Sequence, residues 1–275
     1  MFSDKRIGYL LATPALLLVL LAFVWPIGLL VAGAFQNDAG GPSLSRFTEF
    51  FTDALNQSVF WRTVRLGLLV ALASAVLGYA VALYLVSLPK ASRSRWVGLF
   101  VLPLMVSPVA RTYAWIVILG RTGLVNTALV GSGLLAEPVP ILFTETAVFI
   151  GLVQLFLPLM VLSLVSALEN LPPDVIAAAR VLGAGWLAVF FKIVLPLSKE
   201  GLVIGGTLVF TGAVTAYITP AVLGGSKVLM LETLLYQKVS VSNDFVAASV
   251  IAVILIGMSL ITHMLLKRIS GKARA

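Results

Sequence analysis

The sequence predicts an all-α membrane protein with six transmembrane helices and both termini on the cytoplasmic side. Of the 275 residues, 60% are hydrophobic and only 11% are charged. The mean hydropathy is +1.08. Soluble domains carry about 25% charged residues, so these values exclude a soluble globular domain. Segments in lipid must satisfy every backbone polar group internally, which favours helices for the long apolar runs.

The apolar runs set the expected spans. A helical span needs about 20 predominantly apolar residues. Lys5 and Arg6 precede the first run as in a signal peptide, but this run is too long for one and ends without a small-residue cleavage site. We therefore expect it to be an uncleaved span. We expect one transmembrane domain over residues 1–275, with spans at 8–35, 64–88, 96–119, 147–168, 201–223 and 245–266.

The basic residues set the expected orientation. Of the 19 lysines and arginines, 12 lie in the two termini and in the connections 89–95 and 169–200, whereas six lie in the opposite loops. Cytoplasmic loops carry an excess of Lys and Arg, so the first set is predicted to be cytoplasmic. The same bias accounts for the net charge of +8 without a nucleic-acid partner.

The connection 169–200 is the longest interruption on the cytoplasmic side. Pro172 and Pro173 indicate a helix start, with Asp174 at the expected N-cap. An alanine-rich helix follows, and the segment 182–185 with its two glycines ends it. Residues 186–194 predict a second short helix that ends at Leu195-Pro196. Two short helices joined by a glycine turn form a compact knob, which is suited to docking a soluble partner.

The same connection carries a family resemblance. Ala178-Ala179, Gly183, Ile193 and Leu195-Pro196 resemble the EAA loop of ABC importer permeases, whose pattern is E-A-A, three residues, G, nine residues, I, any residue, L-P. Ala177 stands in place of the family's glutamate, and Glu200 replaces a proline that is usual before Gly201. The resemblance implies the type I ABC importer (MetI-like) permease fold, a cytoplasmic coupling loop at 169–200, and ATPase-coupling residues Ala177, Ala178, Ala179, Arg180, Gly183, Ile193, Leu195 and Pro196.

A second resemblance covers most of the chain beyond the second span. Segments 103–115, 120–126, 219–225 and 234–237 are similar to the permeases of spermidine/putrescine-type importers. This implies ATP-driven uptake of a small solute, with a polyamine expected, by alternating access across a bacterial inner membrane. The implied partners are separate ABC ATPase subunits, a second identical or different permease, a periplasmic or extracellular solute-binding protein and the lipid bilayer. ATP and Mg²⁺ are then expected on the ATPase, and no cofactor on this chain.

Arg111 is the costliest residue within a predicted span, because a charge at bilayer depth must face protein or water. It either lines the path of the solute, pairs with a carboxylate such as Glu145, or caps carbonyl groups where Pro103 and Pro108 loosen the helix. Thr207, Thr211 and Thr215 share one helical face, which indicates either a hydrophilic path or hydroxyls bonded back to the helix. The predicted path residues are Arg111, Tyr113, Trp115, Thr211, Thr215 and Tyr217.

The charge of the solute stays open. No carboxylate lies well inside spans two to six, so a cationic solute would rely on the faces of Tyr113, Trp115 and Tyr217 and on carboxylates of a partner subunit. Alternatively the solute is another small amine, an amino-acid-like compound or an anion, with Arg111 as the counter-charge.

Two other classes of protein are weighed against the importer permease. An enzyme is not expected, because the chain has no Walker A loop, no cysteine and a single histidine, His263. A secondary carrier is the remaining alternative, although such carriers usually hold an acid inside the membrane.

Overall fold

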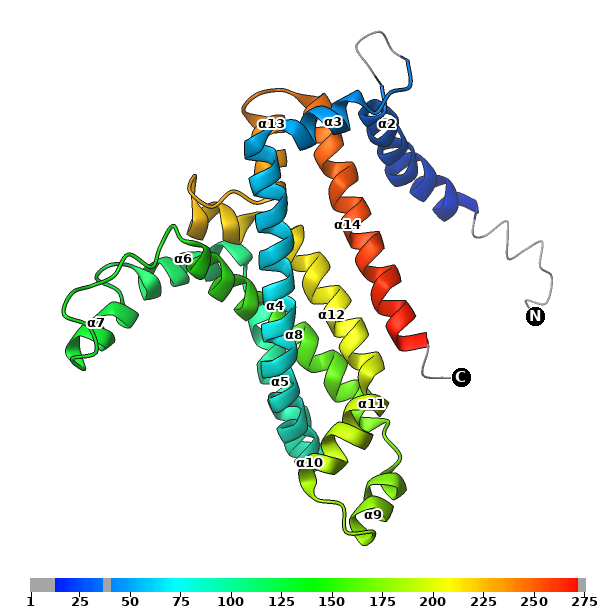
Figure 1. Ribbon diagram of the computed structural model, residues 1–275, viewed down its shortest axis with the longest axis vertical. Coiled ribbons are helices and arrows are strands. Elements are labelled where there is room, and N and C mark those ends of the chain that lie inside the picture. The colour runs from blue at the N-terminus through cyan, green and yellow to red at the C-terminus, as the bar shows by residue number, and fades with distance from the viewer. Residues whose placement is uncertain (1–12, 37–40, 272–275) are drawn as a thin grey trace. The chain divides into compact units, whose positions relative to one another are not determined.

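A computed structural model describes residues 13–36 and 41–271 of the chain. Lys5, Arg6, Lys272 and Arg274, which enter the predicted orientation, lie outside these residues, as does the start of the first predicted span. The described chain is almost entirely helical (Figure 1). It forms two compact units, Met1–Ser58 with Leu235–Ile254, and Val59–Leu234 with Leu255–Ala275.

The first unit is built on an apolar helix, Thr13–Ala34. Its middle widens into a π-helical turn, η1 (Leu20–Val24), before α2 (Trp25–Ala34). The wide turn precedes Pro26, which has no N–H to donate into a regular α-helical ladder. The unit also contains α3 (Ser45–Thr52), part of α13 (Leu231–Ser240) and the start of α14 (Phe245–Gly271).

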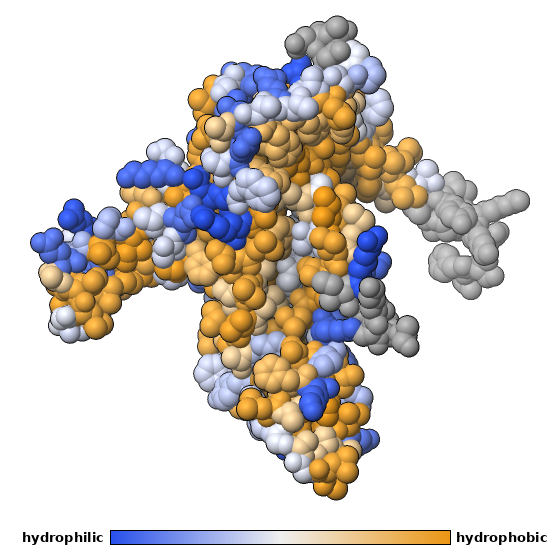
Figure 2. Space-filling model, viewed as in Figure 1, coloured by the Kyte–Doolittle hydropathy of each residue, from blue (hydrophilic) through white to orange (hydrophobic). Residues whose placement is uncertain are grey.

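The second unit holds the remaining helices. The long helices are α4 (Ala54–Ser87, from Val59 onward), α5 (Lys90–Met105), α6 (Pro108–Leu119), α8 (Glu145–Glu169) and α12 (Lys199–Val214). The short ones are α7 (Leu124–Gly131), α9 (Pro173–Val181), α10 (Trp186–Val189), η2 (Phe190–Val194), α11 (Leu195–Leu197) and η3 (Pro220–Gly224). Apolar residues cover most of the surface of these helices in Figure 2, as a lipid-facing protein requires.

Four of the six predicted spans correspond to continuous helices. They are Thr13–Ala34, Ala54–Ser87, Glu145–Glu169 and Phe245–Arg268. Predicted spans 96–119 and 201–223 are each divided, the second because α12 ends after 16 residues. Among the described residues, five helical stretches are long and apolar enough to cross a membrane, Pro108–Gly131 being the fifth. The count of six spans and the cytoplasmic termini therefore stay predictions.

Proline chemistry explains the first division. Val106 and Ser107 are extended, with ψ angles of 140° and 128°, between the end of α5 and Pro108 at the start of α6. A residue before proline is driven out of the α region, and the proline ring pre-sets the first turn of the next helix.

Helices α8 and α12 form the most extensive helix pair of this unit. The pair is close because a Cβ at Gly201 would lie 2.5 Å from Ala167 Cβ, and one at Gly205 would lie 2.6 Å from Met160 Sδ. Ser163 Oγ also donates to the Gly201 carbonyl (2.9 Å). Helix α4 packs on the same pair, since a Cβ at Gly78 would meet Met160 Cγ at 2.8 Å. Glycine at these positions thus sets the contact distance between the three helices.

Candidate functional site

The predicted knob is present as α9, a glycine turn, and the run α10–η2–α11 (Figure 1). Asp174 lies in the first turn of α9 and Arg180 in its last turn, so both charges complement the helix dipole. Asp174 is not the N-cap as predicted: Pro172 takes that position, and Pro173 begins the helix. The proline pair moves the start two residues earlier because Pro173 already has helical φ.

Gly183 ends α9 in a left-handed conformation with φ of +81°. The amide of Ala184 donates to the Ala179 carbonyl (3.0 Å), and that of Gly183 donates to the Arg180 carbonyl (3.0 Å). This pair of bonds is the Schellman arrangement, which needs positive φ at the glycine. Nothing lies within 4 Å of a Cβ at Gly183. The requirement for glycine is therefore one of backbone conformation and not of space.

The second arm of the knob is anchored by aromatic rings. Phe190 stacks on Trp186 with ring centroids 5.8 Å apart, and it meets Tyr79 of α4 edge-on at 5.3 Å. The Tyr79 hydroxyl bonds Ser198 Oγ, which itself donates to the Val194 carbonyl (2.6 Å). Tyr79 and Ser198 are both buried. The knob is thus joined to α4 by packing and by a buried chain of hydrogen bonds.

The predicted coupling residues divide between an outer and an inner face. Ala177, Ala178, Arg180, Gly183 and Pro196 are exposed, whereas Ala179, Ile193 and Leu195 are half-buried. Val181 and Leu182, which sequence reasoning did not single out, are each 87% exposed. Their exposure makes the tip of the knob apolar, and its outer face has the chemistry of an uncovered protein interface.

Arg111 is held at the break between α5 and α6. Its Nη1 donates to the Pro103 carbonyl (2.8 Å), which also accepts the amide of Val106 (3.3 Å) at the end of α5. Of the three possible roles, this bond matches the capping of carbonyl groups at a helix break. Glu145 is not its partner, because that carboxylate binds two arginines of α4.

The other predicted path residues lie on α6 and on or just beyond α12. Tyr113 is exposed, and Trp115 Nε1 donates to Gln154 Oε1 of α8 (3.2 Å). Trp115 and Gln154 line a largely apolar cavity of about 650 Å³ between α4, α5, α6 and α8. Thr211 and Tyr217 are half-buried and Thr215 is exposed, where α12 ends. The helix that follows the second group, η3, packs on both α6 and α8.

The threonine stripe on α12 shows the back-bonding that was one of its two predicted roles. Thr207 Oγ1 donates to the Val203 carbonyl and Thr215 Oγ1 to the Thr211 carbonyl, each at 2.8 Å. These hydroxyls retain lone pairs for a passing solute, but their protons are used within the helix.

Comparison with protein families identifies the class. Residues 74–274 match the family of binding-protein-dependent transport system inner membrane components, and this range includes the knob and both helix breaks. The chain belongs to this family. It is therefore the permease component of an ABC importer, an inner-membrane protein, and not itself an enzyme.

Curated relatives of this permease have names that refer to small nitrogen-containing solutes. It is 33% identical over 211 residues to the spermidine/putrescine transport system permease protein PotB of Haemophilus influenzae, covering 77% of this chain and 73% of that protein. It is 31% identical to PotB of Escherichia coli K12, covering 84% of each. It is 27% identical to the putative 2-aminoethylphosphonate transport system permease protein PhnU of Salmonella paratyphi A, covering 91% and 86%.

Solved structures support the fold of this permease. A chain of a bacterial ABC transporter that imports the acidic polysaccharide alginate matches with a TM-score of 0.79, 16% identity and coverage of 98% and 96%. A chain of the MetNI methionine ABC transporter matches with a TM-score of 0.55, 18% identity and coverage of 80% and 99%. At these identities the likeness concerns the fold alone, and it agrees with the predicted MetI-like architecture.

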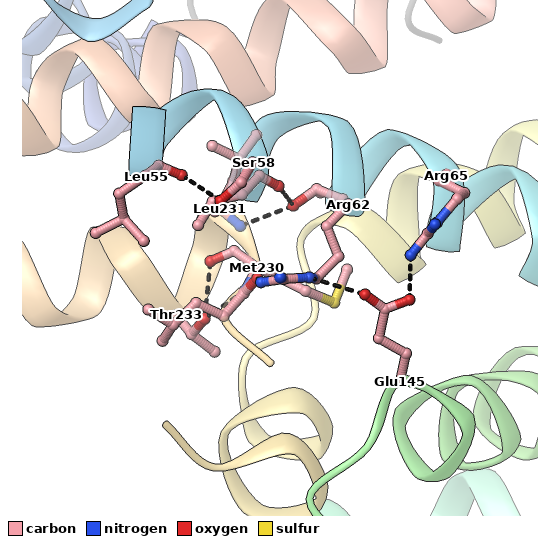
Figure 3. Close-up of polar contacts among 11 residues, drawn as sticks. Leu55, Ser58, Arg62, Arg65, Glu145, Met230, Leu231 and Thr233 are labelled. Carbon is pink, nitrogen blue, oxygen red and sulfur yellow. Dashed lines mark hydrogen bonds and ion pairs between the residues drawn. The ribbon is translucent and has the colours of Figure 1, made fainter. Parts of the chain in front are cut away.

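The permease also contains a polar clamp that sequence reasoning missed (Figure 3). Arg62 Nε donates to Glu145 Oε1 (3.0 Å) and its Nη1 to the Leu229 carbonyl (3.1 Å), while Arg65 binds the other oxygen of Glu145. Thr63 Oγ1 accepts the Leu231 amide (2.9 Å). The clamp joins α4, the start of α8 and the segment before α13.

Asn126 explains one of the segments that carry the family resemblance. The side chain is buried, its Nδ2 donates to the Gly120 and Val139 carbonyls, and its Oδ1 accepts the Val139 amide, all at 3.0 Å. An asparagine satisfies all three bonds at once, which no apolar residue of similar size does. This residue therefore fixes the connection between α7 and α8.

Proposed function

We propose that this permease imports a polyamine of the spermidine and putrescine class by alternating access, driven by a separate ATPase. The observation that carries the substrate class is the identity of 31–33% with PotB permeases over most of their length. Arg111 is held at the helix break through one of its five N–H groups, which donates to the Pro103 carbonyl, and it keeps its positive charge, so the proposal places the ammonium groups of the solute away from it.

The knob supports the proposed coupling to an ATPase. Its outer face combines exposed Ala177 and Ala178 with the apolar tip of Val181 and Leu182. Such a face is expected to lie in a groove of a soluble partner, where burial of two large aliphatic side chains contributes about 1.5–3 kcal/mol each. Arg180 is exposed beside them and is available to pair with an acidic residue of the ATPase.

The assembly that follows has several components. We propose that the chain is one transmembrane domain of six spans with cytoplasmic termini, and that it works with a second permease, ABC ATPase subunits and an external solute-binding protein. Related structures include a transporter bound to a periplasmic protein and the MetNI importer. ATP and Mg²⁺ belong on the ATPase in this proposal, and this chain binds no cofactor.

Uptake measurements test the proposal directly. A cell without its own polyamine importers, given this permease with its ATPase, second permease and solute-binding protein, is expected to accumulate radiolabelled spermidine or putrescine. Loss of the ATPase's Walker A lysine should abolish uptake. Accumulation of 2-aminoethylphosphonate without polyamine would contradict the substrate class and favour a zwitterionic solute, as the likeness to PhnU suggests. Uptake that continues without ATP hydrolysis would indicate a secondary carrier.

A further inference from the structure

The second arm of the knob is apolar on both of its faces. This arm is the helical run α10–η2–α11, Trp186–Leu197 (Figure 1), and Lys192 is its one charged residue. Its inner face packs into the core of the second unit through the buried Val189 and Val194. Its outer face carries large apolar side chains that are 59–65% exposed, namely Trp186, Leu187 and Phe191. A helix that is hydrophobic all round lies inside a protein or in a membrane, so the outer face requires an apolar medium.

The contact with Tyr79 places the arm beside the apolar part of a span. Phe190 meets the ring of Tyr79 edge-on, with centroids 5.3 Å apart. Tyr79 lies within the predicted span 64–88, about 12 Å along α4 before this helix ends at Ser87. No charged residue lies between Tyr79 and Lys90. The arm is therefore level with the last apolar turns of α4 and does not lie beyond them.

The outer face of the arm also adjoins the exposed apolar surface of α12. Leu197 at the end of the arm is exposed, as are Ile204 and Leu208 on α12. These three side chains line one groove beside α8, so they face the same way. Ile204 and Leu208 belong to the predicted span 201–223. The apolar surface of the arm is thus continuous with that of a segment expected in lipid.

Two side chains of the arm suit the boundary between lipid and water. Trp186 begins the arm, and tryptophan is enriched at membrane–water interfaces. Lys192 is exposed, and its long stem lets the ammonium group reach the headgroups while the methylene groups stay in lipid. The first arm of the knob, α9, differs, because it exposes both Asp174 and Arg180, as a surface in water does.

From these contacts we propose that the second arm of the knob is anchored in the interfacial layer of the lipid bilayer, with Trp186, Leu187 and Phe191 among the lipid chains. The whole connection 169–200 was predicted to be cytoplasmic, whereas this inference leaves only α9 and the tip at Val181 and Leu182 for the ATPase. The anchor holds the knob at a fixed level against the bundle. It depends neither on the solute nor on the side of the membrane that the knob faces.

Spin labels on single cysteines test the anchor, because the chain has no cysteine of its own. Leu187→Cys and Phe191→Cys place a label on the exposed face and leave the packed face intact. In the full importer, reconstituted in nanodiscs of phosphatidylethanolamine and phosphatidylglycerol, both labels should collide with dissolved oxygen but not with a water-soluble nickel chelate. Leu72→Cys, an exposed position of α4, is the reference for lipid, and Val181→Cys is the reference for a site covered by the ATPase.

Each other result overturns the proposal. Collisions with the nickel chelate would place the arm in water. Immobile labels that neither reagent reaches, as expected at residue 181, would place the arm beneath the ATPase or the second permease. Failure of the importer to take up a polyamine would leave the labelling result unchanged, so the anchor and the substrate class are tested separately.

Binding of the ATPase gives a second readout without a label. Leu182→Gln removes an apolar side chain from the tip and should weaken ATPase binding about tenfold or more, the factor for burial of one large aliphatic side chain. Phe191→Gln should leave that affinity unchanged, because the ring faces lipid. Equal weakening by both substitutions would assign the second arm to the ATPase and refute the anchor.

Discussion

Substitution of Gly183 separates the backbone conformation of the knob from its surface charge. Residue 183 has φ of +81°, and a Cβ there would meet nothing within 4 Å. A non-glycine residue in this region costs about 1–2 kcal/mol, and a β-branched one costs more. Asparagine and aspartate tolerate the conformation best among residues with side chains. We therefore expect coupling to decline in the order Gly, Asn, Ala, Val if the Schellman turn positions the knob.

The magnitude follows from the same penalty. A cost of 1–2 kcal/mol lowers the population of the correctly folded knob, relative to a frayed one, by a factor of about 5–30. The rest of the helix bundle is not touched, because Gly183 makes no contact that a side chain would displace. Gly183→Val should therefore lose most solute transport per ATP hydrolysed while the protein stays in the membrane at normal level.

Aspartate adds a second comparison at nearly constant shape. Gly183→Asp and Gly183→Asn have similar backbone cost, but aspartate puts a charge beside Val181 and Leu182 on the apolar tip. If an ATPase covers this tip, burial of the charge makes aspartate the more damaging change. The assay is the ratio of spermidine transported to ATP hydrolysed in proteoliposomes. Equal ratios for Val and Asn would refute the conformational argument, and equal ratios for Asp and Asn would refute burial of the tip.

Three further predictions concern stability and pH. Asn126→Ala removes three hydrogen bonds and leaves the Val139 amide without its acceptor. It should therefore lower the free energy of unfolding by about 2–4 kcal/mol and expose the 132–144 connection to protease. Thr127→Ala, on the exposed side of α7, should do neither. Tyr79→Phe keeps the ring contact with Phe190 but loses the hydrogen bond to Ser198, so it should lower the free energy of unfolding by about 1 kcal/mol. A double-mutant cycle with Ser198→Ala should show coupling between the two sites, and additive costs would contradict it. Burial raises the pKa of Glu232 on α13 above its ordinary value of 4.5, so the folded protein binds the proton more tightly than the unfolded chain and loses stability as pH rises above 4.5. Glu232→Gln should therefore raise the melting temperature at neutral pH and change nothing near pH 4, and an unchanged melting temperature at pH 7 would contradict the role of burial.

Local patterns in the sequence predicted the helical class, four continuous spans and the knob. The knob was predictable because its signals are local: a proline pair, an alanine-rich turn and a glycine at a fixed distance. The break near Arg111 was also visible in the spacing of Pro103 and Pro108, and capping of a carbonyl there was one of the stated alternatives. What the sequence left open was the choice among partners, since that choice depends on the register between helices.

Glu145 shows why such choices fail. Its partners, Arg62 and Arg65, lie 83 and 80 residues away in the sequence, and only the packing of α4 on α8 brings them together.

Glu200 was misplaced for a different reason. Ser198 at the start of α12 has no capping bond to the helix, because its hydroxyl binds Val194 and Tyr79 instead. The serine therefore marks the start of α12 without capping it, and the prediction placed the start of the span two residues later than the structure does.

These contacts indicate how a force on the knob would reach the path of the solute. Helices α8 and α12 touch through glycines at 201 and 205, so they are expected to move as one body. The knob is tied to α4 through Tyr79, Ser198 and Phe190, which leaves little freedom between knob and bundle. The freedom lies instead at the divided helices, at residues 106–107 and 215–217, where backbone bonds are interrupted. We infer that displacement of the knob bends the permease at these two breaks. Restoring a continuous helix there, by replacing Pro108 with alanine, should then reduce transport without reducing ATPase binding.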